Sequence, residues 1–149
     1  MSNLPLTGFN SLCESRQKII VSKDGGSQRK HTAENINRAE VTHYRIDGVV
    51  LTEGKKCDFL LLNETTSAAY LIELKGRDLT DAASQLESTE AALKNQLKNY
   101  ILYFRIVSSK SRTHEIESAK FKKFRAAKAG KVNGIAKLIY NTDVINEKI

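Results

Sequence analysis

The chain has 149 residues, enough for one domain whose hydrophobic core needs no disulfide bonds. Its composition, 40% hydrophobic and 28% charged, is that of an ordinary globular protein, and no apolar run reaches the ~18 residues that span a bilayer. Without a signal-peptide pattern, and with Cys13 and Cys57 isolated, we expect a cytoplasmic protein with reduced thiols, not a disulfide scaffold or a zinc site.

The net charge of +7 is unevenly distributed along the chain. Residues 94–137 contain twelve Lys or Arg against two acids, whereas residues 1–93 contain eleven against thirteen. A basic second half suits the binding of a polyanion such as nucleic acid. A basic helix face that only keeps the protein soluble is the alternative, and the strength of the asymmetry favours nucleic acid.

Residues 1–38 are predicted to form an irregular N-terminal section that contains the single proline, Pro5. One short strand is expected there, over residues 17–22, and the turn signal Asp-Gly-Gly-Ser at 24–27 ends it. The polar residues 28–38 are predicted to be a loop or a short helix.

Residues 41–107 are predicted to form the core of the domain. Two of its strands are almost continuously apolar, which indicates that both of their faces are covered. Apolar residues at helical spacing then predict a long helix, with Asp78 or Thr80 as its cap. The expected elements are a strand over 41–51 that turns at Gly48, strands over 57–63 and 68–75, the helix to near Tyr103, and a strand over 104–108.

Residues 108–149 are predicted to contain a basic loop, a basic helix over 115–129, a final strand over 135–141 and a tail. The whole chain, 1–149, is therefore one α/β domain. After the irregular section its order is strand-strand-strand-helix-strand-helix-strand, which predicts a mixed central sheet flanked by helices.

Two of the predicted central strands each carry a carboxylate. Asp58 begins one strand, and Glu73 lies near the end of the next, followed by Lys75. Charges beside apolar strands are costly unless they face one another or a metal, and carboxylate oxygens are ligands that Mg²⁺ prefers. Glu73 and Lys75 are two apart on one strand and should share a face, where Lys75 could hold an attacking water. A structural salt-bridge cluster is the alternative.

The pattern Asp58, fourteen residues, Glu73-Leu74-Lys75 resembles the PD-(D/E)xK nuclease superfamily, which has the restriction-endonuclease-like fold; Cys57 stands where the motif has proline. The resemblance covers residues 41–107. It implies Asp58 and Glu73 as metal ligands, Lys75 as the catalytic lysine, Mg²⁺ or Mn²⁺ as cofactor and DNA as substrate. The likeness to junction-resolving and phage or other mobile-element nucleases implies a homodimer or a larger defence or recombination assembly.

Many members of that superfamily add an acid from an earlier element. Glu34 is the first choice for it here, because it lies in a polar segment before the first core strand. Asp47 and Glu40 are its rivals, and Asp47 can equally belong to an Asp-Gly turn.

Many members also carry a glutamine on the helix after the lysine, as a further catalytic residue. Gln96 and Tyr100 match the Gln-x-x-x-Tyr signature of RecB-like members. Gln85 is favoured, because the helix starts where the lysine-bearing strand stops and Gln96 would lie about 16 Å further along the axis.

Contacts with the nucleic-acid backbone, which give affinity without sequence specificity, are assigned to Arg29, Lys30, Lys110, Arg112, Lys120, Lys122, Lys123, Arg125 and Lys128. The three histidines, His31, His43 and His114, are expected to be structural or solvated. The sequence therefore predicts a Mg²⁺-dependent DNA endonuclease. The alternative is a catalytically inactive module of the same fold that binds nucleic acid or a partner protein.

Overall fold

The computed structural model describes residues 6, 8–25, 28–75, 79–109 and 118–149, without the side chain of Lys75. The strands are β1 (Ile19–Lys23), β2 (Lys30–Glu34), β3 (Val41–Arg45), β4 (Phe59–Asn63), β5 (Ala68–Lys75), β6 (Ile101–Ser108), β7 (Lys131–Val132), β8 (Ile135–Ala136), β9 (Leu138–Thr142) and β10 (Val144–Lys148). The helices are α1 (Leu79–Ala92) and α3 (Ala119–Ala127).

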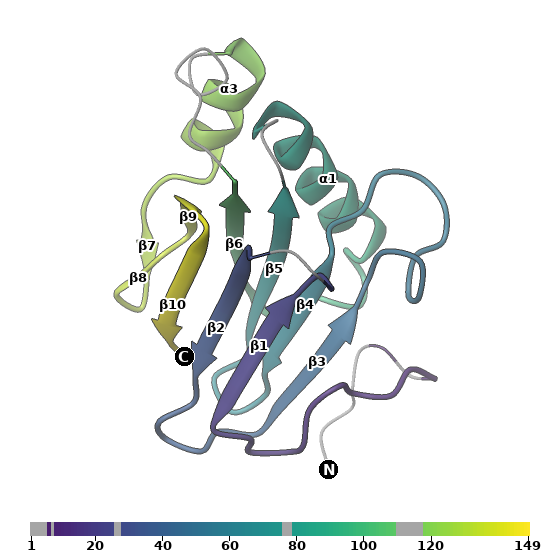
Figure 1. The fold of residues 1–149 in the computed structure, drawn as a ribbon, viewed down its shortest axis with the longest axis vertical. Coiled ribbons are helices and arrows are strands. Elements are labelled where there is room, and N and C mark those ends of the chain that lie inside the picture. Colours follow the sequence, from purple (N-terminus) through teal and green to yellow (C-terminus); the bar gives the residue numbers. More distant parts are fainter. Residues whose placement is uncertain (1–5, 7, 26–27, 76–78, 110–117) are drawn as a thin grey trace.

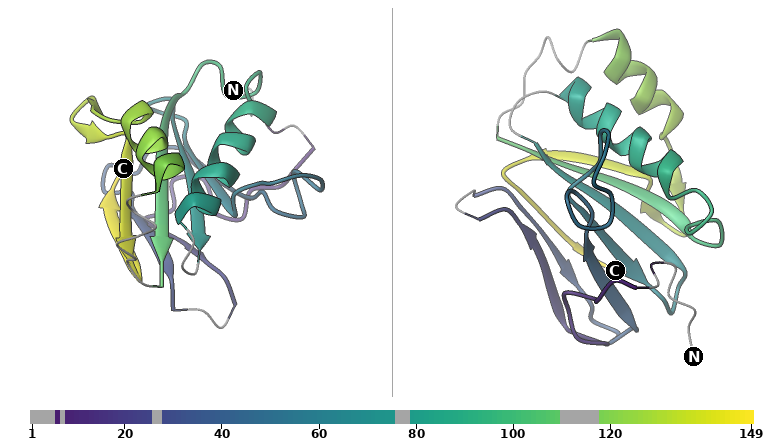
Figure 2. Two further views of the ribbon diagram at one scale, coloured as in Figure 1. Left: turned by 90° about the horizontal axis from the view of Figure 1, so that it is seen from above. Right: turned by 90° about the vertical axis from the view of Figure 1, so that its right-hand side faces the viewer.

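The molecule is built in three layers (Figures 1 and 2). Five strands form a mixed sheet in the order β3-β4-β5-β6-β9, called here the large sheet. Strands β1, β2 and β10 form a second, small sheet. Both helices pack on one face of the large sheet, and the small sheet covers the other face. The α/β class and the mixed sheet are confirmed, but the helices of the described residues cover one face only.

The centre of the large sheet is an antiparallel meander of β3, β4 and β5. All five residues of β4 are buried, as the apolar run predicted, and they alternate between two cores. Leu60 faces the helices, whereas Phe59 faces the small sheet. The turn between β4 and β5 is closed by Asn63, whose side-chain oxygen accepts the N–H groups of Thr65 and Thr66 at 3.1 Å each.

Two crossovers complete the large sheet. Strand β6 runs parallel to β5 after α1, and β9 runs parallel to β6 after α3. Helix α1 buries Leu79, Ala82, Ala83, Leu86 and Thr89, and α3 buries Phe121 and Phe124. Because β5 and β3 end where β4 begins, three strand termini meet at one end of the sheet. We call it the Asp58 end.

The small sheet was not predicted beyond its first strand. Residues 30–34 form β2, not a loop or a short helix, and residues 144–148 form β10, not a tail. Strand β2 buries alternate residues, His31 and Ala33, and its other residues are polar. Its strand character comes from pairing with β1 and β10 and not from apolar composition.

The long helix was predicted too long. Helix α1 ends at Ala92, residues 93–99 form turns, and β6 begins at Ile101, three residues earlier than predicted. Leu93 and Leu97 are still buried. The apolar spacing therefore predicted the burial of these residues correctly and their helical backbone wrongly. Helix α3 lies inside the predicted range 115–129, of which 115–117 fall outside the described residues. Among the described residues, no helix has the length and apolarity to cross a membrane.

Candidate metal and nucleic-acid site

The two predicted metal-binding carboxylates lie on neighbouring strands at the Asp58 end. The antiparallel pairing of β4 with β5 ends at Phe59, which faces Ile72; Asp58 directly precedes this pair on one side and Glu73 directly follows it on the other. Asp58 donates its backbone N–H to the Ile72 carbonyl at 3.1 Å. Its side-chain Oδ2 accepts the Leu74 N–H at 2.9 Å. Both residues are buried, with exposed fractions of 8% and 2%.

The environment of Asp58 favours its protonated form. Burial raises the pKa of Asp58 to about 6, the Leu74 N–H and Arg45 act in the opposite direction, and the charges of Asp24 and Asp47 raise it further. The charges of Asp24 and Asp47 therefore add to the negative potential around Asp58. A divalent cation would offset this potential.

Glu73 shares a side of β5 with Leu71 and Ala69, which belong to the helix-side core. The neighbouring Cys57 thiol has its pKa raised by burial and by the charges of Glu73 and Asp58, which indicates that both carboxylates lie near it. Ile72 and Leu74 lie in the core on the opposite face, as predicted. Lys75 is the last residue of β5, and its side chain lies outside the described part of the chain.

The structure does not bring Glu34 to these carboxylates. Glu34 is the last residue of β2, and the following Asn35 bonds to Ala39, next to the start of β3. The Glu40 carbonyl accepts the Glu64 N–H just after β4 ends, so both acids lie at the far end of the strands from Asp58 (Figure 1). The prediction of Glu34 as the third metal-binding acid is therefore corrected, because Glu34 lies away from Asp58.

Asp47 is the rival that lies near Asp58. It follows β3, close to the Ile46 N–H that donates to the Asp58 carbonyl at 2.8 Å. Its carboxylate is half-exposed and lies 3.6 Å from Lys56 Nζ. The Asp-Gly turn was predicted as an alternative role, and Gly48 does have a positive φ of 80°. The two roles are therefore compatible.

Of the two candidate glutamines, Gln85 lies nearer to the Asp58 end than Gln96 does. Gln85 lies on α1, and its Nε2 donates to Asp81 Oδ2 at 2.9 Å. Asp81 in turn accepts a hydrogen bond at 2.9 Å from Nζ of Lys55, and Lys55 lies in the loop before Asp58. Gln96 lies beyond the helix in the exposed turns, and Tyr100 bonds to Glu64 at the far end of the sheet.

The basic residues of α3 fall into two classes. Lys120 and Lys128 form ion pairs with Glu87 and Glu90 of α1, at 2.6 and 2.8 Å. Lys128 also lies 4.5 Å from the centre of the Phe104 ring, so it serves the packing of the two helices. Arg125 is half-buried, and its guanidinium donates to the Tyr140 hydroxyl at 3.5 Å.

Lys122 and Lys123 form the second class. Both are exposed, and neither makes an ion pair within the described ranges. Helix α3 begins near the Asp58 end, because Ser118 Oγ lies 2.7 Å from Thr80 Oγ1 in the first turn of α1. Of the remaining candidates, Arg29 and Lys30 lie at the start of β2 and are half-buried. Lys110 and Arg112 fall outside the described residues.

No group of three or more His, Cys, Asp or Glu side chains that could hold a metal occurs among the described residues. The Asp58–Glu73 pair alone still fits Mg²⁺, which typically takes one or two protein carboxylates and completes its shell with waters and substrate phosphate. Mn²⁺ accepts the same oxygen donors.

A second charged group, not predicted from the sequence, lies between the two sheets. Arg105 of β6 is completely buried, and its guanidinium donates to both carboxylate oxygens of Glu147, at 2.6 and 2.9 Å. The same carboxylate lies 2.6 Å from His31 Nε2. The Arg105 group also stacks over the rings of Tyr70 and Tyr103. One signal was available: Arg105 interrupts an otherwise apolar strand.

The remaining described histidine, His43, is also structural, as expected. It is buried, its Nε2 lies 2.8 Å from Ser22 Oγ across the two sheets, and its ring stacks on Phe59. Burial, aided by the nearby His31, lowers the pKa of His43 to about 4. His114 lies outside the described residues.

Acidification should therefore destabilise the fold through His43. Between pH 6.5 and about 4 the unfolded chain binds a proton at this residue that the folded chain excludes, which removes up to about 3 kcal/mol of unfolding free energy. Urea unfolding at pH 7, 5.5 and 4.5 should show a difference between the wild type and His43→Asn that shrinks as pH falls. A difference independent of pH would contradict this assignment.

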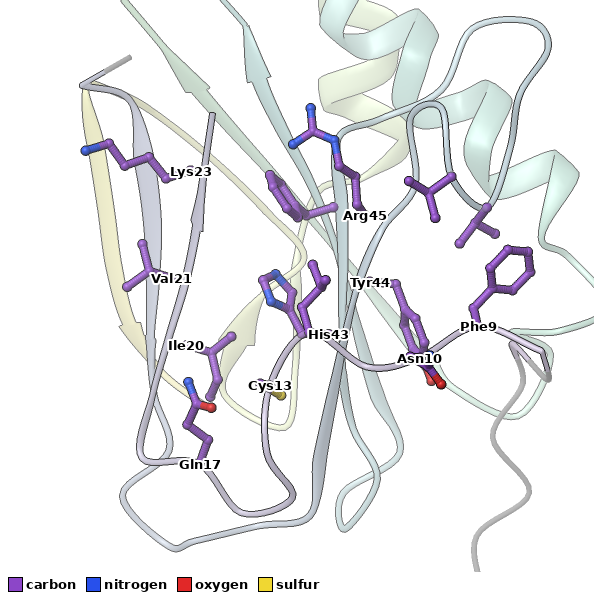
Figure 3. A pocket seen from close by; sticks show the side chains of 14 residues that line it. Phe9, Asn10, Cys13, Gln17, Ile20, Val21, Lys23, His43, Tyr44 and Arg45 are labelled. Carbon is purple, nitrogen blue, oxygen red and sulfur yellow. The ribbon is translucent and has the colours of Figure 1, made fainter. Parts of the chain in front are cut away.

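A hollow of about 460 Å³ lies along the outer edge of β3, between β1, the N-terminal segment and the turn after β3 (Figure 3). Four of the large hydrophobic side chains exposed to solvent line it: Phe9, Leu12, Val21 and Val49. Arg45 also lines it, and bonds to Asp24 at 3.1 Å. The hollow thus reaches the Asp58 end.

The chain was compared with protein-family models, with curated proteins and with solved structures, and none of the three comparisons found a match.

Proposed function

We propose that this protein is a Mg²⁺-dependent nuclease that hydrolyses phosphodiester bonds of DNA, with a core of the restriction-endonuclease-like type. The observation that carries the proposal is the pair of buried carboxylates: Asp58 lies just before β4, Glu73 lies near the end of β5, and Asp58 bonds to Ile72 and Leu74, the residues on either side of Glu73. Both acids are buried at the rim of the sheet, and burial raises the pKa of Asp58, so its charge opposes folding. Binding of a catalytic metal would account for two buried acids at this position.

The topology supports the same proposal. The meander β3-β4-β5, the crossover through α1 and the parallel strand β6 form the order that the resemblance implies for residues 41–107. In this order the acid of the second strand and the Glu-x-Lys of the third meet at one end of the sheet. The helix that follows starts beside them.

Asp58 and Glu73 would hold the metal, with Asp47 as the third acid nearby. When bound, Mg²⁺ lowers the pKa of a coordinated water and offsets charge on the phosphate. The Leu74 N–H holds the Asp58 carboxylate in place, since it donates to Oδ2. We assign to Lys75 the role of orienting the attacking water and balancing phosphate charge. Gln85, bonded to Asp81, lines the approach from α1.

The proposal is tested with the purified chain and a panel of linear, nicked, branched and single-stranded DNA, each with Mg²⁺, Mn²⁺ or EDTA. Cleavage of at least one substrate is expected with either metal and not with EDTA. An RNA of the same sequence tests the choice of DNA. Absence of cleavage on every substrate, or cleavage that persists in EDTA, would overturn the proposal.

DNA binding should depend on Lys122 and Lys123 more than on Lys120 and Lys128. The double variant Lys122→Ala, Lys123→Ala removes two exposed charges, so the slope of log affinity against log salt should decrease by about 2. Fluorescence anisotropy with a labelled duplex in EDTA measures this slope. The control is Lys120→Ala, Lys128→Ala, which breaks pairs with α1 and should lower stability more and the slope less. Equal slopes for both variants would refute the distinction.

A binding module without catalysis is the second candidate function. The hollow beside β3 favours it, because Leu12 and Val49 are 59% and 52% exposed at its rim. Exposed apolar groups gathered at one place are typical of a surface that binds a partner protein. This candidate predicts DNA or partner binding that survives Asp58→Asn and Glu73→Gln, and no measurable uptake of Mn²⁺.

A further inference from the structure

A buried hydroxyl joins α1 to the residue just before Asp58. Thr89 lies on the inner face of α1 and is completely buried. Its Oγ1 donates to the Gln85 carbonyl at 2.8 Å and accepts the Cys57 N–H at 2.7 Å. A hydroxyl has one proton and two lone pairs, so both bonds form at once.

Cys57 directly precedes Asp58, whose backbone is held by hydrogen bonds on both sides. Asp58 is bonded through its backbone to Ile72 on one side and to Ile46 on the other. Cys57 precedes β4, is fully buried, and directs its N–H to a helix instead of a strand. A buried N–H without an acceptor costs ~1–3 kcal/mol, so this bond strongly restricts where Cys57 can lie.

We infer that Thr89 is a positioning residue for Asp58: its hydroxyl sets the distance between α1 and the start of β4, and thereby the place of the Asp58 carboxylate. The inference rests on the proposed nuclease function, because it assigns Asp58 to a metal. Thr89 touches neither substrate nor metal. Its hydroxyl acts on Asp58 through the hydrogen bond from the Cys57 N–H. Its second bond, to the Gln85 carbonyl, ties the same hydroxyl to the turn of α1 that carries Gln85.

The test replaces Thr89 with Val, which keeps the shape and removes the hydroxyl. In the full chain, Mn²⁺ affinity measured by calorimetry should decrease about tenfold, the effect typical of residues that support a metal ligand. The Mg²⁺ concentration for half-maximal DNA cleavage should increase by the same factor. Thr89→Ser retains the hydroxyl and should restore both values.

Ser84 supplies the matched control on the same helix. Its hydroxyl donates to the Thr80 carbonyl at 3.2 Å, four residues earlier, as Thr89 does with Gln85, but it makes no hydrogen bond to a strand within the described residues. Ser84→Ala should leave Mn²⁺ affinity unchanged. If Thr89→Val does not fold, Thr89→Ala takes its place, because the smaller side chain leaves room for a water beside the Cys57 N–H.

The outcomes separate the inference from the nuclease proposal. A Thr89→Val protein with a lower melting temperature and unchanged Mn²⁺ affinity would overturn the inference and leave the nuclease standing. If the wild type binds Mn²⁺ but cleaves no nucleic acid, and Thr89→Val weakens Mn²⁺ binding, the inference holds and the nuclease proposal fails. A wild type that binds no Mn²⁺ overturns both.

Discussion

Replacing Glu73 by glutamine is expected to reduce DNA cleavage by about 10³-fold while leaving the protein folded. Glutamine keeps the size of the side chain and removes the charge that the metal requires. Because Glu73 is buried, the neutral amide also avoids the cost of holding a charge away from water. The melting temperature of Glu73→Gln should therefore equal or exceed that of the wild type, measured by circular dichroism.

Glu34→Gln is the matched control for this prediction. It makes the same chemical change on the last residue of β2, at the far end of the sheet, and should leave cleavage unchanged. Asp47→Asn should fall between the two, because Asp47 acts on Asp58 electrostatically. If Glu73→Gln lowers the melting temperature and retains activity, the acids are a structural cluster and the site lies elsewhere.

The placement of Asp58 and Glu73 at the same end of the sheet could be predicted because it depends on local structure. Both residues are about equally far from the polar turn at 64–67, so a hairpin closed there brings them to the same end of its two strands. The same argument correctly places Ile72 and Leu74 in the opposite core. This prediction needs only two strands and the turn between them, and it depends on no distant part of the chain.

The third acid could not be predicted in the same way. Its position depends on the direction in which β2 and β3 run and on the connection between them, which sequence spacing does not contain. Glu34 precedes the core strands in sequence but ends its strand at the wrong end of the molecule. Asp24, which the sequence predicts only as part of a turn, follows β1 and acts on Asp58.

The small sheet was missed because two of its strands are polar. Strands β2 and β10 lie side by side in parallel, joined by no local connection, so neither shows its partner in the sequence. What makes a buried His31 tolerable is Glu147, more than a hundred residues later in the chain. Arg105 was counted among the bases for nucleic acid, although it is a core residue. The basic second half is therefore less available to a ligand than its composition suggests.

Glu147→Gln is expected to cost about 3–5 kcal/mol of unfolding free energy, the largest stability effect predicted for this chain. The substitution leaves the Arg105 guanidinium buried between the sheets without its counter-ion. Its contacts with the carbonyls of Phe104, Ala136 and Lys137 remain, but they carry no full negative charge. Urea unfolding followed by circular dichroism at pH 7 measures the change.

Glu87→Gln is the control, because its pair with Lys120 has the same 2.6 Å separation but is 39–45% exposed. That variant should cost less than about 1 kcal/mol, since water screens the pair and hydrates the remaining charge. The double variant Arg105→Met, Glu147→Met should recover most of the loss, because well-packed apolar side chains can replace a buried pair. Recovery would assign the cost of Glu147→Gln to the isolated cation and not to lost packing of β10. If Glu147→Gln costs no more than Glu87→Gln, the ion pair does not hold β10 of the small sheet against β6 of the large sheet.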